Sequence, residues 1–195
     1  MQLVTRINAH DEDVQHAVRK RPEFQHRSLA AAWMLRTGLR AWSGRPTEAA
    51  LRRDKQGRPC SSTGEPHLSI AHDDLTVAVA FAAHNPVGID IEPRSRHVPA
   101  AVVDLLEPVG ESDALAAWTT YEAIAKADGR GIGLPVAHLA RISTSKRWRL
   151  REGDEYVVTH RELGSGSLLA VAWRSETPPL LAIATADGVS QGISP

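Results

Sequence analysis

The chain has 195 residues, of which 42% are apolar and 24% are charged, and its formal net charge is zero. This composition is typical of a globular protein and excludes a largely disordered chain. The first residues contain no apolar run of signal-peptide length, and no stretch approaches the roughly 20 apolar residues of a membrane span. We therefore expect a cytoplasmic protein. Cys60 is the only cysteine, which excludes a disulfide framework or a cysteine-based zinc site within one chain.

The charges are unevenly distributed along the chain. Residues 19–59 contain eleven Lys or Arg and three Asp or Glu, a local balance of +8. Residues 60–128 contain eleven acidic and three basic residues, a balance of −8. A basic segment followed by an acidic one suits a phosphate-rich ligand together with a metal ion, although two solvated faces of opposite sign would give the same pattern.

The first half of the chain predicts helices followed by strands. Apolar residues recur at helical spacing from Gln25 to Trp42, which indicates an amphipathic helix. A short helix from Thr47 to Arg53 and a turn at Gln56 to Pro59 should follow. Three strands separated by short turns are then expected to form an antiparallel meander. They cover Leu68 to Ala71, Leu75 to Phe81 and Val87 to Glu92.

The second half of the chain predicts the same order of elements. Ser112 is a suitable N-cap for a helix that runs to about Asp128, where Gly129 would end it. Four further strands are then expected. They cover Leu139 to Ile142, Trp148 to Arg151, Tyr156 to Glu162 and Leu168 to Trp173.

The repeated order predicts an α+β fold with two similar lobes in a pseudo-two-fold arrangement. Each lobe would be a long helix packed on a small antiparallel sheet. Residues 1–95 would form the N-terminal lobe and residues 96–175 the C-terminal lobe. Residues 176–195 would be a loosely attached tail.

Asp90 and Glu92 lie in the strand predicted from Val87 to Glu92. Because alternate side chains of a strand share a face, the two carboxylates lie side by side while Ile89 and Ile91 face a core. A cation relieves the repulsion between such groups, and Mg²⁺ prefers hard oxygen ligands completed by water and substrate phosphate. The alternative is an exposed strand face, which this spacing also fits.

Glu122 and Lys126 are four residues apart on the second predicted long helix, so they lie on one helical face. The alternative to a functional role is a surface ion pair, which would contribute about 0.3–0.5 kcal/mol. Several alanines surround the pair and would let the helix pack closely against another element. The glycines after Asp128 would let backbone approach a ligand.

Four segments, in order, resemble motifs of the 4'-phosphopantetheinyl transferases, in their long two-lobed (surfactin-synthetase-activating) class. Gly57-Arg58-Pro59 is similar to Gly-Lys-Pro, Ser69-Ile70-Ala71-His72 to Ser/Asn-x-Ser-His, and Gly88-Ile89-Asp90-Ile91-Glu92 to Gly-(Val/Ile)-Asp-(Ile/Val)-Glu. Trp118 to Lys126 is similar to Trp-x-x-Lys-Glu-Ala/Ser-x-x-Lys. Arg27-Ser28 and Arg36 also fit the family's first long helix. The joint spacing of the last two motifs is the most specific part of the resemblance.

The resemblance implies an Mg²⁺-dependent enzyme with its active site in the cleft between the lobes. Such an enzyme transfers the 4'-phosphopantetheine group of coenzyme A to a serine of an acyl or peptidyl carrier protein and releases 3',5'-ADP. The carrier would serve polyketide, nonribosomal-peptide or fatty-acid biosynthesis. The family also implies a monomer, and we expect neither nucleic acid nor membrane as a partner.

The resemblance also implies roles for individual residues. Asp90, Glu92 and Glu122 would surround Mg²⁺, and Lys126 would touch the reacting phosphate. Glu122 is our candidate for the general base, directly or through a metal-bound water, with a bound hydroxide as the competitor. The motifs imply a coenzyme A-binding set of Arg27, Ser28, Arg58, Pro59, Ser69, His72 and Lys126.

The sequence departs from the family pattern in three places. Tyr121 stands where the family has the first lysine of its helix motif, and Ala71 replaces the serine before His72. The segment between Glu92 and Trp118 is short. These departures motivate an alternative, a catalytically impaired module that binds coenzyme A or a carrier protein. A third possibility is an unrelated Mg²⁺-dependent phosphohydrolase.

Overall fold

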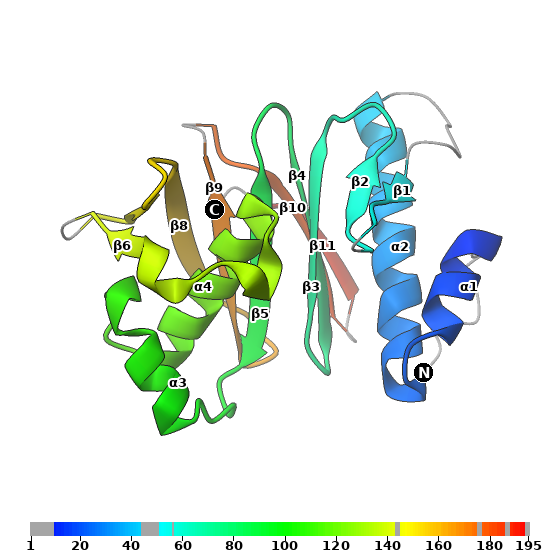
Figure 1. The fold of residues 1–195 in the computed structure, drawn as a ribbon. Helices are drawn as coiled ribbons and strands as arrows, with labels where there is room; N and C mark the ends of the chain where they lie inside the picture. Colours follow the sequence, from blue (N-terminus) through cyan, green and yellow to red (C-terminus); the bar gives the residue numbers. More distant parts are fainter. Residues whose placement is uncertain are drawn as a thin grey trace.

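The computed structural model describes residues 10–43, 51–55, 57–142, 145–174, 177–185 and 188–193, and within them it shows a mixed α+β fold (Figure 1). The α+β part of the predicted fold is therefore confirmed. No helix in these ranges is both long and apolar enough to cross a membrane. The α-helices are α1 (Asp11–Val18), α2 (Pro22–Ser43), α3 (Ala100–Leu105) and α4 (Ala114–Asp128), with short 3-10 helices at Glu107–Val109, Gly131–Gly133 and Val136–His138.

The strands form antiparallel sheets. The two larger sheets have the strand orders β11-β10-β4-β3 and β5-β9-β8-β7-β6, and β1 and β2 form a separate hairpin. The hairpin and the four-stranded sheet contain β1 (Leu51–Arg53), β2 (Pro59–Ser61), β3 (His67–His72), β4 (Thr76–Ala82), β10 (Leu180–Thr185) and β11 (Gly188–Ile193). The five-stranded sheet contains β5 (Val87–Pro93), β6 (Leu139–Arg141), β7 (Arg147–Leu150), β8 (Glu155–Glu162) and β9 (Ser167–Trp173).

Helix α2, the first long helix predicted, packs on the four-stranded sheet. Its buried residues Leu35 and Leu39 share a core with Val79 and Phe81 of β4. Gly38 lies over Phe81, and a Cβ atom at position 38 would come within 2.2 Å of Cζ of that ring. The glycine therefore permits the close approach that buries this face of α2.

Helix α4 is the second long helix predicted, but its N-cap differs. Asp113, and not Ser112, caps it, because the Asp113 carboxylate accepts hydrogen bonds from the amides of Leu115 at 2.8 Å and Ala116 at 3.2 Å. Carboxylates are also favoured at this end by the helix dipole. Gly129 ends the helix with φ of +93°, as predicted from its sequence position.

The predicted antiparallel meander is wrong at its third strand. β3 and β4 are paired as expected, but the second edge of β4 is taken by β10, and β5 pairs instead with β9. β5 lies beside β3 without a strand ladder between them. Here the Ser69 hydroxyl accepts a hydrogen bond from the amide of Ile89 at 3.1 Å. We call this junction of β3 with β5 the seam.

Two further expectations are wrong. The helix predicted from Thr47 to Arg53 is a strand, β1, over Leu51–Arg53, and its earlier residues lie outside the described ranges. The Asp54 carboxylate accepts a hydrogen bond from the amide of Arg58 at 2.9 Å, which closes a tight turn to β2. The tail is also firmly attached where it is described, because β10 pairs with β4 along its length and buries Leu181 and Ile183.

Gly88 sets the distance between β5 and α4. A Cβ atom at this position would lie 1.9 Å from the carbonyl oxygen of Ala123 and 2.5 Å from the amide nitrogen of Ala127. Both are backbone atoms of α4, so no side chain can turn aside to make room. Helix and strand therefore pack backbone against backbone, which places the residues next to Gly88 against those of α4.

Replacement of Gly88 by alanine should destabilise the fold. We expect Gly88→Ala to lower the free energy of unfolding by about 2–3 kcal/mol, because the added methyl group must push α4 away from β5. Urea denaturation measures this change. Gly133→Ala is the matched control, since a Cβ there meets nothing within 4 Å, and it should change stability by less than about 0.5 kcal/mol. Equal effects of the two substitutions would contradict the proposed role of Gly88.

Candidate active site

An aspartate of β5 and a lysine of α4 form an ion pair. Asp90 is only 7% exposed, and its Oδ1 atom lies 2.7 Å from Nζ of Lys126. The same ammonium group donates a hydrogen bond to the carbonyl oxygen of Ile89 at 3.0 Å. The Lys126 side chain itself is about one-third exposed. The carboxylate of Asp90 is thus buried, whereas the side chain of Lys126 is accessible to a ligand.

Glu92, the second carboxylate of β5, lies in a small cluster of its own. Its Oε1 atom accepts hydrogen bonds from Nε1 of Trp118 at 3.2 Å and from the guanidinium group of Arg96. The guanidinium group also lies 5.3 Å from the centre of the Trp118 ring, a cation–π distance. The sequence analysis named Trp118 only as the first residue of the helix motif and did not identify Arg96. The only signal for Arg96 was its position four residues after Glu92.

Glu122 lies near both carboxylates of β5. Burial, and next the negative charge of Asp90, raise the pKa of Glu122 above its ordinary value, while Lys126 opposes this shift. Burial also raises the pKa of Asp90, against the opposing effect of Lys126 and with a smaller contribution from Glu92. The three carboxylates therefore interact, and additional positive charge would stabilise their ionised forms.

The carboxylates have the donor chemistry that Mg²⁺ prefers. Oδ2 of Asp90 is buried and has no hydrogen-bond partner within the described part of the chain. A buried, unpaired carboxylate oxygen is costly and fits a metal ligand. However, no three His, Cys, Asp or Glu side chains among the described residues converge into a metal-binding group. Lys126 pairs with Oδ1 of Asp90 and Arg96 pairs with Oε1 of Glu92, so a metal ion would have to displace these side chains to bind at those two oxygens.

A second group of predicted residues lies where α2 meets the end of β3. Arg27 forms an ion pair with Asp74 at 2.7 Å and lies 5.4 Å from the centre of the Phe24 ring. The Phe24 ring also contacts His72, with 6.3 Å between ring centres. Desolvation of the ring and the cations Arg27 and Lys126 lower the pKa of His72, although its side chain remains exposed. His72 is the last residue of β3, the strand that lies beside β5 and its carboxylates.

A shallow pocket of about 210 Å³ brings Arg58 and Pro59 together with Lys126. Arg58 pairs with Asp54 at 2.6 Å and donates a hydrogen bond to the carbonyl oxygen of Gly129, at the end of α4. The β1–β2 hairpin is thereby fixed to the helix that carries Lys126. This hydrogen bond joins two residues that lie 71 positions apart in the sequence.

Two predicted binding residues show different surroundings. Ser69 is buried in the seam, and its hydroxyl group already accepts the hydrogen bond from Ile89. Ser28 is half-buried on α2, one residue after Arg27. The structure therefore brings Arg27, Arg58, His72 and Lys126 to one side of the molecule but gives Ser69 a role in joining the two sheets.

Tyr121 is buried in the core. It is 5% exposed, belongs to the core that α4 forms with the five-stranded sheet, and donates a hydrogen bond from its hydroxyl group to the carbonyl oxygen of Leu134 at 2.7 Å. The residue at the family's first-lysine position is thus a structural anchor for the 3-10 helix Gly131–Gly133 that follows α4.

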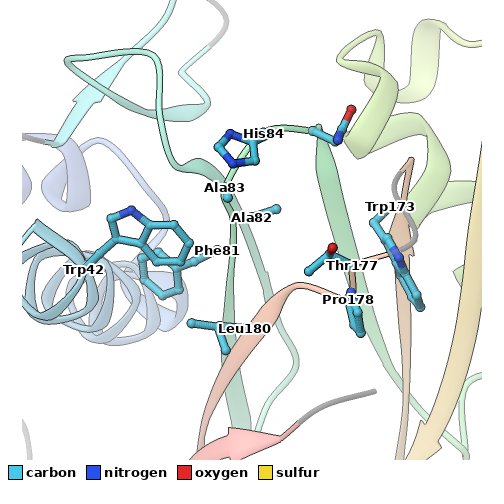
Figure 2. Close-up of a pocket in the computed structure, with 10 residues that line it drawn as sticks. Trp42, Phe81, Ala82, Ala83, His84, Trp173, Thr177, Pro178 and Leu180 are labelled. Atoms are coloured by element: carbon cyan, nitrogen blue, oxygen red, sulfur yellow. The ribbon is translucent and has the colours of Figure 1, made fainter.

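The larger hollows of the structure lie elsewhere. One cavity of about 320 Å³ lies where the C-terminal end of α2 meets β10 and the end of β9. Figure 2 shows Trp42 and Phe81 on one side of it and Trp173 on the other. A neighbouring groove of about 500 Å³ continues along α2. The linings of these two hollows are mainly apolar and contain no carboxylate. A third hollow, of about 440 Å³, is lined by Asp104, Glu107 and Glu111 but by no Lys or Arg. Among these hollows, only the shallower site at Lys126 offers Lys and Arg side chains to a phosphate.

Comparison with known proteins gives no family assignment. No protein-family model matches the chain, and no curated protein is significantly similar to it.

Variants of Tyr121 test its structural role. Tyr121→Phe should lose about 1 kcal/mol of stability, because the carbonyl group of Leu134 loses its hydrogen bond. Tyr121→Lys should lose about 3–5 kcal/mol, because the ammonium group must be buried or deprotonated. Thermal unfolding followed by circular dichroism gives both values. If Tyr121→Lys were as stable as Tyr121→Phe, the side chain at this position would be reaching solvent.

Glu122 should make stability depend on pH. Because its pKa is raised in the folded protein, the folded state holds the proton more tightly than the unfolded state does. The contribution of Glu122 to stability therefore falls as the pH rises above its ordinary pKa of 4.5. Glu122→Gln removes this effect and should be more stable than the unaltered protein at pH 7, with the difference shrinking toward pH 4. Thermal unfolding in EDTA across this range is the measurement, and parallel curves would contradict it.

Proposed function

We propose that the protein transfers 4'-phosphopantetheine from coenzyme A to a serine of an acyl or peptidyl carrier protein. In this reaction the serine oxygen bonds to the β-phosphorus of coenzyme A, the bond from that phosphorus to the bridging oxygen breaks, and 3',5'-ADP leaves. The observation that carries the proposal is the meeting of Asp90 and Glu92 with Glu122 and Lys126, which belong to two separate sequence motifs. The order and spacing of the four motifs support it further.

The residues around the site suit a phosphoryl-type transfer. Lys126 holds an ammonium group at the edge of the buried carboxylates, where it can pair with phosphate oxygens once Asp90 releases it. Glu122, whose pKa is raised, is the proposed acceptor of the proton from the serine. When bound, Mg²⁺ would be held by Asp90, Glu92 and Glu122 and would neutralise the charge that develops on the phosphate oxygens.

Arg27 and His72 lie at the end of β3, and we call them the cationic group because Arg27 carries a positive charge. This group suits the end of coenzyme A that carries the 3'-phosphate. Arg27 and His72 would bind its 3'-phosphate, and Arg58 would contact the same end of coenzyme A from the β1–β2 hairpin. Phe24, which sequence reasoning did not include, offers a ring beside His72 on which an adenine could stack. In this proposal α2 with its sheet and α4 with its sheet are the two lobes, and coenzyme A lies across the seam between them.

One observation favours the alternative, a module that binds coenzyme A or a carrier without catalysis. Lys126 and Arg96 neutralise the carboxylates that would otherwise hold the metal. Activity with a carrier protein distinguishes this alternative from the transferase.

The decisive assay incubates a panel of apo carrier proteins with the protein, coenzyme A and Mg²⁺, and measures each carrier by intact-mass spectrometry. We expect at least one carrier to gain the mass of one phosphopantetheine group, and we expect EDTA to prevent the gain. Coenzyme A binding without any transfer would favour the binding module. Release of phosphate without a carrier would favour a phosphohydrolase.

Glu122→Gln separates loss of chemistry from loss of folding. It should lower the transfer rate by at least about 100-fold, since removal of a general base typically costs 10²–10⁴, while the protein remains at least as stable as the unaltered one. Lys146→Ala, which removes an exposed lysine far from the site, is the control and should transfer at the normal rate. A fully active Glu122→Gln protein would remove Glu122 from the mechanism.

A further inference from the structure

A buried polar cluster closes one end of the seam. Asp73 directly follows β3, and its Oδ1 atom accepts hydrogen bonds from the amides of Leu75 at 2.8 Å and Thr76 at 2.7 Å. Its Oδ2 atom accepts a hydrogen bond from the hydroxyl group of Ser167, the first residue of β9. Asp73, Thr76 and Ser167 are all less than 9% exposed. The turn after β3 is thus hydrogen-bonded to the start of β9.

A second contact strengthens this connection. The hydroxyl group of Thr76 donates a hydrogen bond to Ser165 at 2.9 Å, and that serine donates one in turn to Ser167 at 3.3 Å. The turn that contains Ser165 is tied to the end of β5, because the carbonyl oxygen of Gly166 accepts a hydrogen bond from the amide of Arg94 at 3.0 Å. The cluster therefore links β3 to β5 through the turn between β8 and β9.

The position of this cluster relates it to both parts of the candidate site. Asp73 is the neighbour of His72, which belongs to the cationic group. Ser167 is paired with Pro93, the neighbour of Glu92. Glu92 belongs, with Asp90 and Glu122, to the set of acidic side chains that we call the carboxylate group. No strand ladder spans the seam between the described strands, so these side-chain bonds and the Ser69–Ile89 bond are the polar contacts that supplement the core shared by Ala71 of β3 and Ile89 of β5.

We infer that Asp73 and Ser167 are positioning residues that fix the distance between the cationic group and the carboxylate group. This inference rests on the proposed function, in which coenzyme A contacts both groups at once. A ligand that spans the seam needs both groups at one separation, whereas a ligand that contacts only the cationic group does not. Preorganisation of this kind lowers the cost of binding for the spanning ligand alone.

The test compares two ligands with the Ser167→Ala protein by titration calorimetry in Mg²⁺. Coenzyme A should bind at least about tenfold more weakly, a change that loss of one hydrogen bond to a charged group can produce. Adenosine 3'-monophosphate, which offers only the 3'-phosphate and the adenosine, should bind within about twofold of normal, because it contacts residues on the β3 side of the seam alone and does not need a fixed separation across it. Ser145→Ala, in the β6–β7 turn, is the matched control and should change neither affinity.

Thr76→Val provides a second variant of nearly the same shape. It removes the hydrogen bond to Ser165 and should show the same selective loss if Ser167→Ala does not fold. Equal weakening of both ligands in these variants, or no weakening of coenzyme A, would overturn the inference.

A measurement without ligand distinguishes failure of this inference from failure of the proposed function. If the unaltered protein did not bind coenzyme A, the proposed function would be wrong, and amide hydrogen exchange would decide the remaining question. The Ile89 amide should exchange at least about tenfold faster in Ser167→Ala, since the seam opens locally, while the Val158 amide should exchange at its normal rate. An unchanged Ile89 amide would show that Ser167 does not hold the seam.

Discussion

The backbone contact between β5 and α4 at Gly88 is the constraint on which the candidate site depends. A side chain at this position would overlap the backbone of α4, so its absence lets helix and strand approach until Lys126 reaches Asp90. That ion pair, in turn, compensates a carboxylate that is almost fully buried. The packing of the core and the electrostatics of the site are thus set by one feature, because the strand and the helix that form the core also carry the charged groups.

Local patterns in the sequence were sufficient to find most elements. Apolar residues at helical spacing identified α2, and a cap followed by a closing glycine identified α4 to within a residue at its start. Alternation of apolar residues located β3 to β9. The same reasoning placed Asp90, Glu92, Glu122 and Lys126 on the elements where they are found, since strand alternation and the i, i+4 relation of a helix are local properties.

What the sequence could not supply depends on contacts between distant segments. The pairing of β5 with β9 is decided by β10, which occupies the edge of β4 that a meander would have used. No feature of the sequence near residue 90 indicates that β10 takes this edge of β4. The burial of Tyr121 has the same origin, because a helix has several faces and only tertiary packing decides which one meets the core. The pair of Arg96 with Glu92 is local in the sequence, but Arg96 lies outside the helices and strands, where no periodicity predicts the direction of a side chain. The strand β1 was mistaken for a helix because a three-residue element has too little periodicity to identify.

The pairing of each β5 carboxylate with a basic side chain of the same chain has a consequence for assembly. Many metal-binding domains fold only after the ion arrives, because their ligands repel one another without it. Here Lys126 and Arg96 serve as internal counter-ions, so the acidic strand can be buried during folding without help from solution. The burial of Asp90 therefore does not require a bound cation, because Lys126 already supplies the opposite charge. A cation approaching Asp90 and Glu92 would have to compete with these two side chains, which already stabilise the carboxylates within the folded chain.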